Sequence, residues 1–449
     1  MKQNKIDLTS GSPFEVILKF AIPVIGGNLF QLFYTLADSV IVGKTLGADS
    51  LAAVGATSIV VYFVLCFIQG MTSGFGICLG QRYGAEDYAA ARKSIAASTV
   101  LSFLFTVLIT VLCCSLAYPI VRWMKTPSDI YQEAYTYMFI VLLGSGATFF
   151  YNLISNFLRA MGDSKTPLYY LVFSSLLNVV LDIVFIVPFR MGVAGAAWAT
   201  VLSQLISAVL CMWTGWHKFD EFHLRREDFS DLMRTSASHL KIGFTMGFQM
   251  SVMCIGQLSM QSAVNALGSV AVAGYTVATK VDQVSVLVNN AMISAVSAFV
   301  SQNYGAGNRE RIRQGVRAGL IQTQALNVLM GVGILLLREP IVALFIEHPT
   351  KEIIVYSNGY LNWVAPCYLL LGFLAIYRCA VQSMGNTIAP FTACIIELVM
   401  RLGSTIGLCA VAGYLGVCLA SPLAWLGACS LLVPVYYHMV TIQSHAHVQ

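Results

Sequence analysis

The sequence predicts an all-α integral membrane protein in which twelve transmembrane helices form two six-helix lobes, related by a pseudo-twofold axis along the membrane normal. Three observations predict this fold. The chain is 57% hydrophobic and only 10% charged, whereas about a quarter of the residues of a soluble protein are charged. Twelve apolar segments are long enough for a bilayer, which takes about 20 residues to cross. A short sequence string also occurs once in each half.

The repeated string indicates duplication of a whole structural unit. Gln-Arg-Tyr-Gly-Ala at residues 81–85 returns as Gln-Asn-Tyr-Gly-Ala at residues 302–306, about half of the chain later. Both copies close a long apolar segment, and the period is far too long for a short solenoid repeat. Met-Gly-Asp at 161–163 and Met-Gly-Asn at 384–386 stand at nearly the same offset. The chain is therefore expected to consist of two similar halves.

Each predicted span is an apolar run bounded by loop residues. In the first half the spans lie near residues 14–38, 51–80, 94–118, 133–158, 168–189 and 193–216. In the second half they lie near residues 240–264, 270–302, 315–337, 353–380, 388–411 and 415–440. The stretch between the two sets is the longest charged interruption. We therefore expect an N-lobe at residues 1–216, a cytoplasmic linker at 217–239 and a C-lobe at 240–449.

Three of these spans carry features of their own. Pro23 removes a backbone hydrogen bond from the first span, so that helix is expected to kink there. The kink is either static or a hinge that gives the helix two shapes. Gly70-x-x-x-Gly74 in the second span and Gly243-x-x-x-Gly247 in the seventh supply small faces on which helices can pack closely.

The basic residues predict the orientation of the chain. Eighteen of the 26 Lys and Arg residues fall on the side of the termini and the linker, and six fall on the opposite side. Cytoplasmic loops carry the excess of Lys and Arg, so both termini are expected in the cytoplasm. The start of the chain is polar and unlike a secretory signal, so the first span should remain in the mature protein. An even number of spans per half gives both halves the same orientation.

Composition argues against several kinds of partner. The twelve cysteines include no Cys-x-x-Cys pair and lie mostly inside apolar runs, so we interpret them as small buried hydrophobes and not as metal ligands. The net charge is +5, and the basic residues behind it lie mostly between the spans, where they set the orientation of the chain in the membrane. We expect no metal site, no organic cofactor and no nucleic-acid partner.

Six charged residues remain at membrane depth after every charge that can be assigned to a loop or to the end of a span is set aside. An ionised side chain at the middle of a bilayer costs about 2.5–3.5 kcal/mol, so each needs a partner, water or a function. The six are Asp38, Asp182, Lys280, Asp282, Glu397 and Arg401.

Two of these acids belong to a polar set in the first half. Asn178 and Asp182 are four residues apart and share one helical face, while Asp38 and Thr200 lie in the first and sixth spans. Two carboxylates close together in a low dielectric cannot both ionise cheaply, so a cation or a proton must accompany them. These four residues predict an ion-coupling site. The alternative is that Asp38 faces water near the outer rim and Asp182 bonds a neighbouring helix.

The charges of the second half leave two interpretations open. Lys280 and Asp282 are two residues apart and do not face each other, whereas Glu397 and Arg401 are four apart and can pair within one helix. That pair is either structural or part of a substrate cavity. All four residues are candidates for the wall of such a cavity.

Taken together, the motifs resemble those of the multidrug and toxic compound extrusion (MATE) family. The resemblance rests on the two six-span halves, the Gln-x-Tyr-Gly-Ala string, the Met-Gly-Asp-Ser-Lys-Thr-Pro loop at 161–167, and Pro23 followed by Gln31, Tyr34 and Asp38. It covers essentially the whole chain.

The resemblance implies roles for particular residues. It implies that Asp38, Asn178, Asp182 and Thr200 form a cation site in the N-lobe. Gln31 and Tyr34 would line the nearby cavity, for which Asn152 and Asn156 are further candidates. The second half departs from the family pattern, because its seventh span carries amides where some members have carboxylates. A C-lobe sodium site of that type is therefore not expected. The early proline of that span is also replaced by Phe244-Thr245, which predicts a more rigid helix.

The predicted function is secondary active export of organic, chiefly cationic, compounds by antiport, with a proton or sodium ion as the coupling ion and alternating access as the mechanism. We expect a monomer in the plasma membrane, in contact with lipid. One alternative is a lipid-linked or polysaccharide flippase, which would favour a cavity ringed with arginines. Another is a membrane-embedded enzyme in which Asp38 and Asp182 imitate an aspartyl protease pair. No glycine-rich motif surrounds either aspartate, and the duplicated lobes would have no role in an enzyme of this kind.

Overall fold

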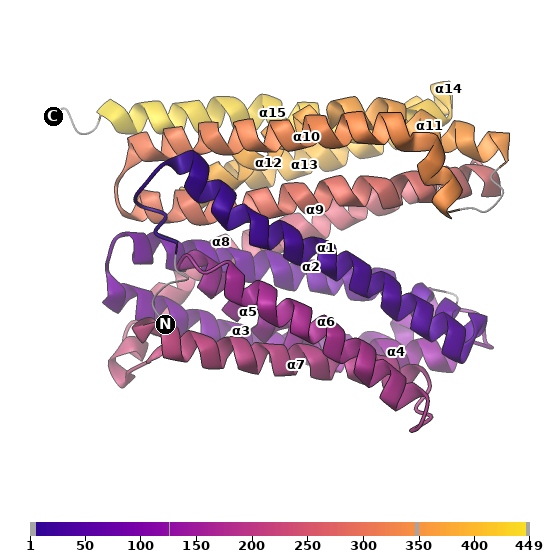
Figure 1. Ribbon diagram of the computed structural model, residues 1–449, viewed down its shortest axis with the longest axis horizontal. Helices are drawn as coiled ribbons and strands as arrows, with labels where there is room; N and C mark the ends of the chain where they lie inside the picture. Colours follow the sequence, from indigo (N-terminus) through magenta and orange to yellow (C-terminus); the bar gives the residue numbers. More distant parts are fainter. Residues whose placement is uncertain (1–5, 125, 346–349, 446–449) are drawn as a thin grey trace. The chain divides into compact units, whose positions relative to one another are not determined.

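The computed structural model describes residues 6–124, 126–345 and 350–445, and all regular structure in these ranges is helical (Figure 1). The all-α class is therefore confirmed. Lys2, Lys5 and Lys125, which entered the charge count, lie outside the described residues. The helices up to the middle of the chain are α1 (Pro13–Leu46), α2 (Ala48–Gly84), α3 (Tyr88–Trp123), α4 (Tyr131–Leu143), α5 (Ser145–Ala160), α6 (Lys165–Ile186) and α7 (Val193–Lys218).

The second half begins after two short turns of 3-10 helix, η1 (Asp220–Phe222) and η2 (Arg226–Phe229). Its helices are α8 (Leu232–Asn265), α9 (Ser269–Gly305), α10 (Arg309–Phe345), α11 (Lys351–Val364), α12 (Tyr368–Ser383), α13 (Ile388–Gly403), α14 (Cys409–Ala412) and α15 (Tyr414–His445). A 3-10 turn, η3 (Ala365–Cys367), joins α11 to α12, and a π-helical turn, η4 (Ser404–Leu408), joins α13 to α14.

The described chain falls into two compact units, and two helices are divided between them. Unit 1 holds residues 6–7 and 26–248, and unit 2 holds residues 8–25 and 249–445. The first part of α1 therefore belongs to unit 2 and the first part of α8 belongs to unit 1. Pro23 lies inside the continuous helix α1, close to the transition between the units. The predicted lobe boundaries at 216 and 240, and the hinge at Pro23, stay predictions.

Ten helical stretches in the described ranges are long and apolar enough to cross a membrane, and the pair α4 and α5 makes an eleventh if it counts as one span. That pair corresponds to the predicted fourth span and is bent by 41° at Gly144. The predicted seventh span falls in α8, which is long but is not among these apolar stretches. Its amides, which include Gln249, Gln257 and Gln261, lower its hydropathy.

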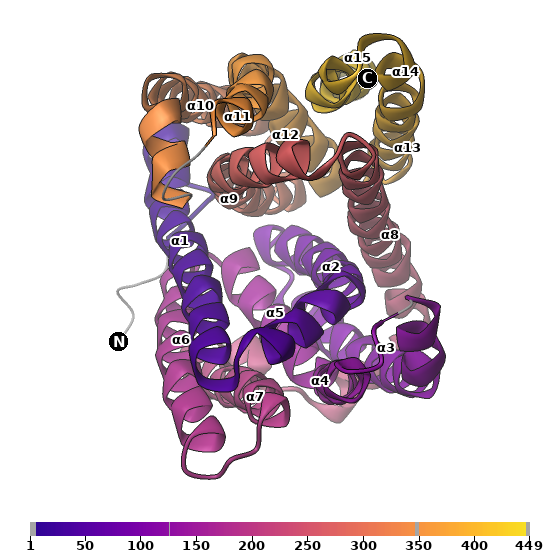
Figure 2. The same ribbon diagram turned by 90° about the vertical axis from the view of Figure 1, so that its right-hand side faces the viewer.

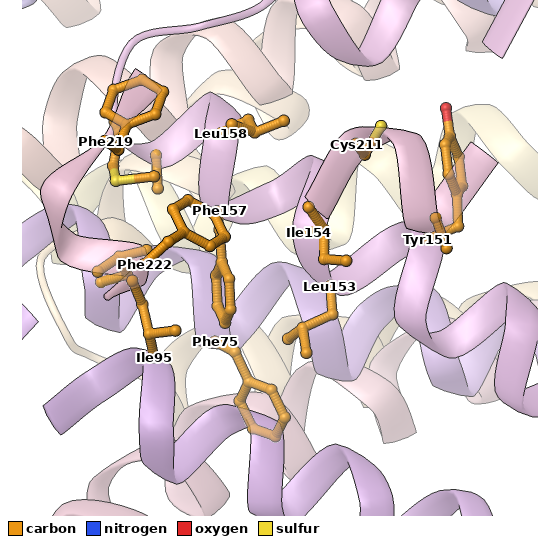
Figure 3. Close-up of a cluster of buried hydrophobic side chains, with 14 of the residues drawn as sticks. Phe75, Ile95, Tyr151, Leu153, Ile154, Phe157, Leu158, Cys211, Phe219 and Phe222 are labelled. Carbon is orange, nitrogen blue, oxygen red and sulfur yellow. The ribbon is translucent and has the colours of Figure 1, made fainter. Parts of the chain in front are cut away.

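A buried cluster of large apolar side chains forms the core of unit 1 (Figure 3). Phe75 of α2, Ile95 of α3 and Phe157 of α5 lie in it, each no more than 1% exposed. Phe219 and Phe222 join them from the stretch predicted as a linker. The start of that stretch is therefore packed into the core, because its two phenylalanines bury apolar surface there.

The two glycine motifs, which the sequence predicts to be packing faces, meet each other inside unit 1. A Cβ atom added at Gly74 would lie 2.5 Å from the Cα of Gly243, and one added at Gly70 would lie 2.4 Å from the carbonyl oxygen of Met246. No side chain fits at such distances, so glycine is required where α2 crosses the first part of α8. The close approach lets the two backbones gain dispersion contacts without bulky side chains between them.

Candidate functional site

The helices α6 and α7 run side by side within unit 1 (Figure 2) and carry three of the predicted site residues. Asn178 and Asp182 stand one helical turn apart on α6 and are 1% and 0% exposed. The amide Nδ2 of Asn178 donates to the Oγ1 of Thr200 on α7 at 3.4 Å. The Thr200 hydroxyl in turn donates to the carbonyl oxygen of Ala196 at 3.1 Å. The hydroxyl oxygen of Thr200 and the carbonyl oxygen of Asn178 therefore remain as acceptors.

Asp38 reaches this group from α1. Its carboxyl group and that of Asp182 lie within hydrogen-bonding reach of each other. Neither carboxylate oxygen of Asp182 has a protein donor among the described residues, and the same holds for Asn178 Oδ1 and Asp38 Oδ1. Four buried oxygen atoms thus converge without a donor to satisfy them. A proton shared between the carboxyls, or a hard cation that prefers oxygen ligands, would satisfy this arrangement.

Two tyrosines complete the surroundings of the pair. The Tyr34 phenol lies in hydrogen-bond contact with Thr200 and in electrostatic contact with both carboxyls. Tyr137 of α4 lies in electrostatic contact with Asp38 and Asp182 as well. The sequence reasoning missed Tyr137, because a single tyrosine in an apolar helix is typical of ordinary packing. The sequence does offer one indication of its role, because the hydroxyl of a tyrosine within an apolar span needs a polar partner.

Three further candidates of the first half form no hydrogen bond with the pair in the described structure. Gln31 is exposed, and no interaction connects its side chain with Asp38 or Asp182 in the described structure. Asn152 donates to the Thr148 carbonyl in its own helix at 2.9 Å. Asn156 donates to Thr72 Oγ1 of α2 at 3.2 Å and helps to join α5 to α2. A cavity role for these three residues stays a prediction.

In unit 2 the structure places the predicted charges in two settings. Lys280 is exposed, and Asp282 Oδ1 accepts a hydrogen bond from the Tyr368 hydroxyl at 2.8 Å. Glu397 and Arg401 do pair within α13, with Oε2 and Nη2 3.8 Å apart. The closer partner of Glu397 is Arg378 of α12. Arg378 is one of the eighteen basic residues counted on the side of the termini and the linker. It lies inside α12 and not in a loop, and its guanidinium pairs with the buried carboxylate of Glu397.

No group of three or more His, Cys, Asp or Glu side chains that could hold a metal ion occurs in the described parts of the chain. The cysteines there are free, and they are buried or half-buried. The candidate ion site is accordingly built from carboxyl, amide and hydroxyl oxygens, a set suited to a proton or an alkali cation.

The MatE family model matches residues 23–184 and residues 246–405, one stretch in each half of the chain. The chain belongs to this family. As a MATE protein it is a multi-pass membrane transport protein and not an enzyme, so the transport prediction is confirmed and the protease alternative is excluded. Asp38, Asn178 and Asp182 lie within the first matched stretch.

The MATE relatives include two proteins of Bacillus subtilis. The probable multidrug resistance protein YpnP is 32% identical over 84% of this chain and 84% of its own length. The probable multidrug resistance protein YoeA is 27% identical over 83% of this chain and 81% of its own. A solved structure described as an outward-facing multidrug resistance MATE family transporter superimposes with a TM-score of 0.91, at 23% identity, over 99% of this chain and 100% of the other. The similarity of the two structures shows that this chain and that transporter have the same fold.

Proposed function

We propose that this MATE protein is a secondary active multidrug exporter, which exchanges organic, chiefly cationic, compounds for protons or sodium ions by alternating access. The relatives named as multidrug resistance proteins support the export of several compounds. The observation that supports ion coupling is the pair of Asp38 and Asp182, three of whose carboxyl oxygens are buried and have no protein donor in the described structure. Such a pair holds a cation or a proton more readily than it stays empty.

The coupling scheme follows from the charge of the site. When the site is empty, two carboxylates face each other in a low dielectric, and an entering cation removes that repulsion. A cationic substrate and the coupling ion therefore compete for the same negative charge, so the substrate leaves as the ion arrives. Asn178 and Thr200 supply neutral oxygens that can solvate the ion without changing the charge.

The available driving force is sufficient for export. At a potential of about 150 mV, one entering charge yields roughly 3.5 kcal/mol, which sustains a gradient of about 300-fold for a neutral substrate. A singly charged cation exchanged for one proton moves no net charge. Its export would then run on the pH difference alone, unless more than one ion enters.

The proposal includes the architecture and the location. Twelve spans require that α8 cross the membrane beside the eleven apolar stretches, with its amides facing other helices. Two lobes, at residues 1–216 and 240–449, would be related by a twofold axis along the membrane normal. The protein would be a monomer in the plasma membrane, in contact with lipid and with both termini in the cytoplasm.

The test is dye extrusion from cells that lack their own exporters. Wild-type protein should lower the cellular content of a cationic dye, and an uncoupler that collapses the ion gradients should abolish the effect. Asp182→Asn should be present in the membrane in equal amount and extrude no dye. Extrusion by Asp182→Asn at the wild-type rate would refute the assignment of the site. The exposed Asp49 of α2 offers a matched control, since Asp49→Asn removes the same charge away from the pair.

A further inference from the structure

Unit 2 holds a buried charge cluster that the coupling scheme does not use. Arg378 of α12 donates to Glu397 Oε1 of α13, and Arg401 Nη2 lies 3.8 Å from the other oxygen of the same carboxylate. The side chains of Arg378, Arg401 and Glu397 are 13%, 7% and 2% exposed. One carboxylate therefore serves two guanidinium groups inside the protein.

Several donors of the two arginines have no acceptor in the described structure, and Glu397 Oε2 itself has no hydrogen-bond donor there. The Nε atoms of Arg378 and Arg401 have no hydrogen-bond partner among the described residues. Arg378 Nη1 reaches only the sulfur of Met253, at 3.8 Å. A guanidinium has five N–H donors in a fixed plane and cannot lose its charge. Buried donors of this kind are costly when they are left unpaired, which indicates a ligand rather than a purely structural ion pair.

The groups around the cluster do not supply the missing acceptors. Asp282 accepts from Tyr368 and forms no ion pair with either arginine in the described structure. The titratable groups in electrostatic contact with the two arginines, apart from Glu397, include Asp282 and Tyr275 of α9, Tyr360 of α11, Cys379 of α12, Cys394 of α13 and Cys429 of α15. Phenols and thiols are ordinarily neutral at pH 7. From α8, Gly256 approaches Arg401 with its backbone, since a Cβ there would lie 3.2 Å from Arg401 Cδ.

We propose that Arg378 and Arg401 bind the acidic group of a substrate, and that Glu397 occupies this place when no such substrate is bound. Paired N–H donors of arginine match the two oxygens of a carboxylate, sulfonate or phosphate. The acid takes the position that the Glu397 carboxylate holds between the two guanidinium groups. The proposal rests on the export function above, and it extends the substrates from cations to small organic acids and zwitterions.

A proton balances the exchange. When the acid displaces Glu397 from the arginines, the buried carboxylate loses its partners and takes up one proton. The bound anion and the proton enter together, Glu397 becomes a neutral carboxylic acid, and the total charge of the cluster is unchanged. Release of the acid reverses each of these steps. Because one proton is bound with each acid, the dissociation constant should rise tenfold for each unit of pH.

The experiment measures equilibrium binding of a tritiated aryl sulfonate, whose charge is constant between pH 6 and 8, to the purified full-length protein. The wild type should bind it with a dissociation constant that rises about tenfold per pH unit. Glu397→Gln should bind it with a constant that does not vary with pH, because no proton is needed. Arg378→Gln and Arg401→Gln should each weaken binding by at least about tenfold, as expected for the loss of a charge-assisted pair.

Three controls keep the outcomes distinct. Arg378→Lys keeps the charge and the fold but loses the planar donor pair, so its affinity should fall between those of the wild type and Arg378→Gln. Lys351→Gln removes an exposed charge of the same unit and should leave binding unchanged. Added phosphatidylglycerol should not displace the sulfonate; displacement at equal concentration would assign the site to a lipid headgroup and overturn the proposal.

Absence of sulfonate binding, equal binding by Arg378→Gln, or a wild-type affinity that does not change with pH would each refute the site. The measurement uses no ion gradient. A failure of coupled export would therefore leave the binding result intact, and a failure of binding would leave coupled export intact.

Discussion

Asp38 of α1 and Asp182 of α6 bring their carboxyl groups within hydrogen-bonding reach of each other inside unit 1. Asp182 is completely buried, and its oxygens have no other donor in the described chain. Two acids in this relationship behave as one titrating unit, which holds one proton or one cation between them. The pair is therefore the element on which ion coupling in this MATE protein is proposed to depend.

Removal of the charge of either Asp38 or Asp182 should reduce efflux as much as removal of both charges. Asp38→Asn and Asp182→Asn are each expected to lower gradient-driven efflux at least about tenfold, and the double variant should be no worse than either single one. Initial efflux rates of a cationic dye provide the measurement, with Asp49→Asn as the matched control. Additive losses would show that the two carboxyls act independently.

The crossing of α2 and α8 should tolerate no side chain at Gly74. Gly74→Ala places a methyl group 2.5 Å from Gly243 Cα, and overpacking of this kind costs about 1–3 kcal/mol. We expect a lower midpoint of thermal unfolding in detergent. Gly55→Ala, at a position in the same helix where a Cβ meets nothing within 4 Å, should leave the midpoint unchanged or slightly raised. Equal midpoints for the two variants would contradict the close crossing.

His239, the last residue of the predicted linker, should make stability depend on pH. Its Nε2 lies 2.6 Å from Ser94 Oγ and its Nδ1 lies 2.8 Å from the Thr235 carbonyl oxygen. Burial, with a smaller contribution from Arg82, lowers the pKa of His239 to about 4. The unfolded chain, with an ordinary histidine pKa of about 6.5, then binds more protons than the folded one between these values. Stability is therefore fully present above pH 6.5 and falls as the pH drops towards 4.

The expected loss between pH 7.5 and pH 5.5 is about 1.4 kcal/mol, seen as a lower midpoint of thermal unfolding. His239→Gln keeps polar atoms near Ser94 and should remove this part of the pH dependence. His438→Gln, at an exposed position of α15, should not. A wild-type profile that matches that of His239→Gln would argue against a neutral buried histidine.

The proposed orientation predicts which loops are reachable from outside the cell. Cysteines introduced at the exposed residues Glu227 and Glu310 should resist a membrane-impermeant thiol reagent in intact cells and react after lysis. A cysteine at the exposed Asp129 should react in both cases. Position 222 is unsuitable for this assay, since Phe222 is only 1% exposed. Labelling of Glu227→Cys in intact cells would contradict the proposed orientation and would place this loop outside the cell.

The sequence predicts most of the helices and part of the site. Long apolar runs, such as those of α2 and α9, were assigned correctly because the bilayer requires about 20 apolar residues per span. The bend between α4 and α5 and the division of α1 and α8 between the units were not foreseen. These features depend on neighbouring helices, which leave no periodic signal in the chain.

The polar residues of the site could likewise be predicted only where the partners lie in the same helix. Asn178 and Asp182 could be paired from their spacing, because residues four apart share a helical face. Tyr137 and Arg378 could not be assigned, since each acquires its partners from other helices. Arg378 also lies near the end of its apolar run, where a basic residue ordinarily marks a cytoplasmic loop.

The most direct measurement is efflux of a cationic dye from proteoliposomes under proton and sodium gradients imposed separately. At least one of the two gradients should drive efflux by the wild-type protein, and the same gradient should drive none by Asp182→Asn. Efflux by the wild type without either gradient, or equal gradient-driven efflux by Asp182→Asn, would contradict the proposal that the Asp38 and Asp182 pair couples ion entry to export.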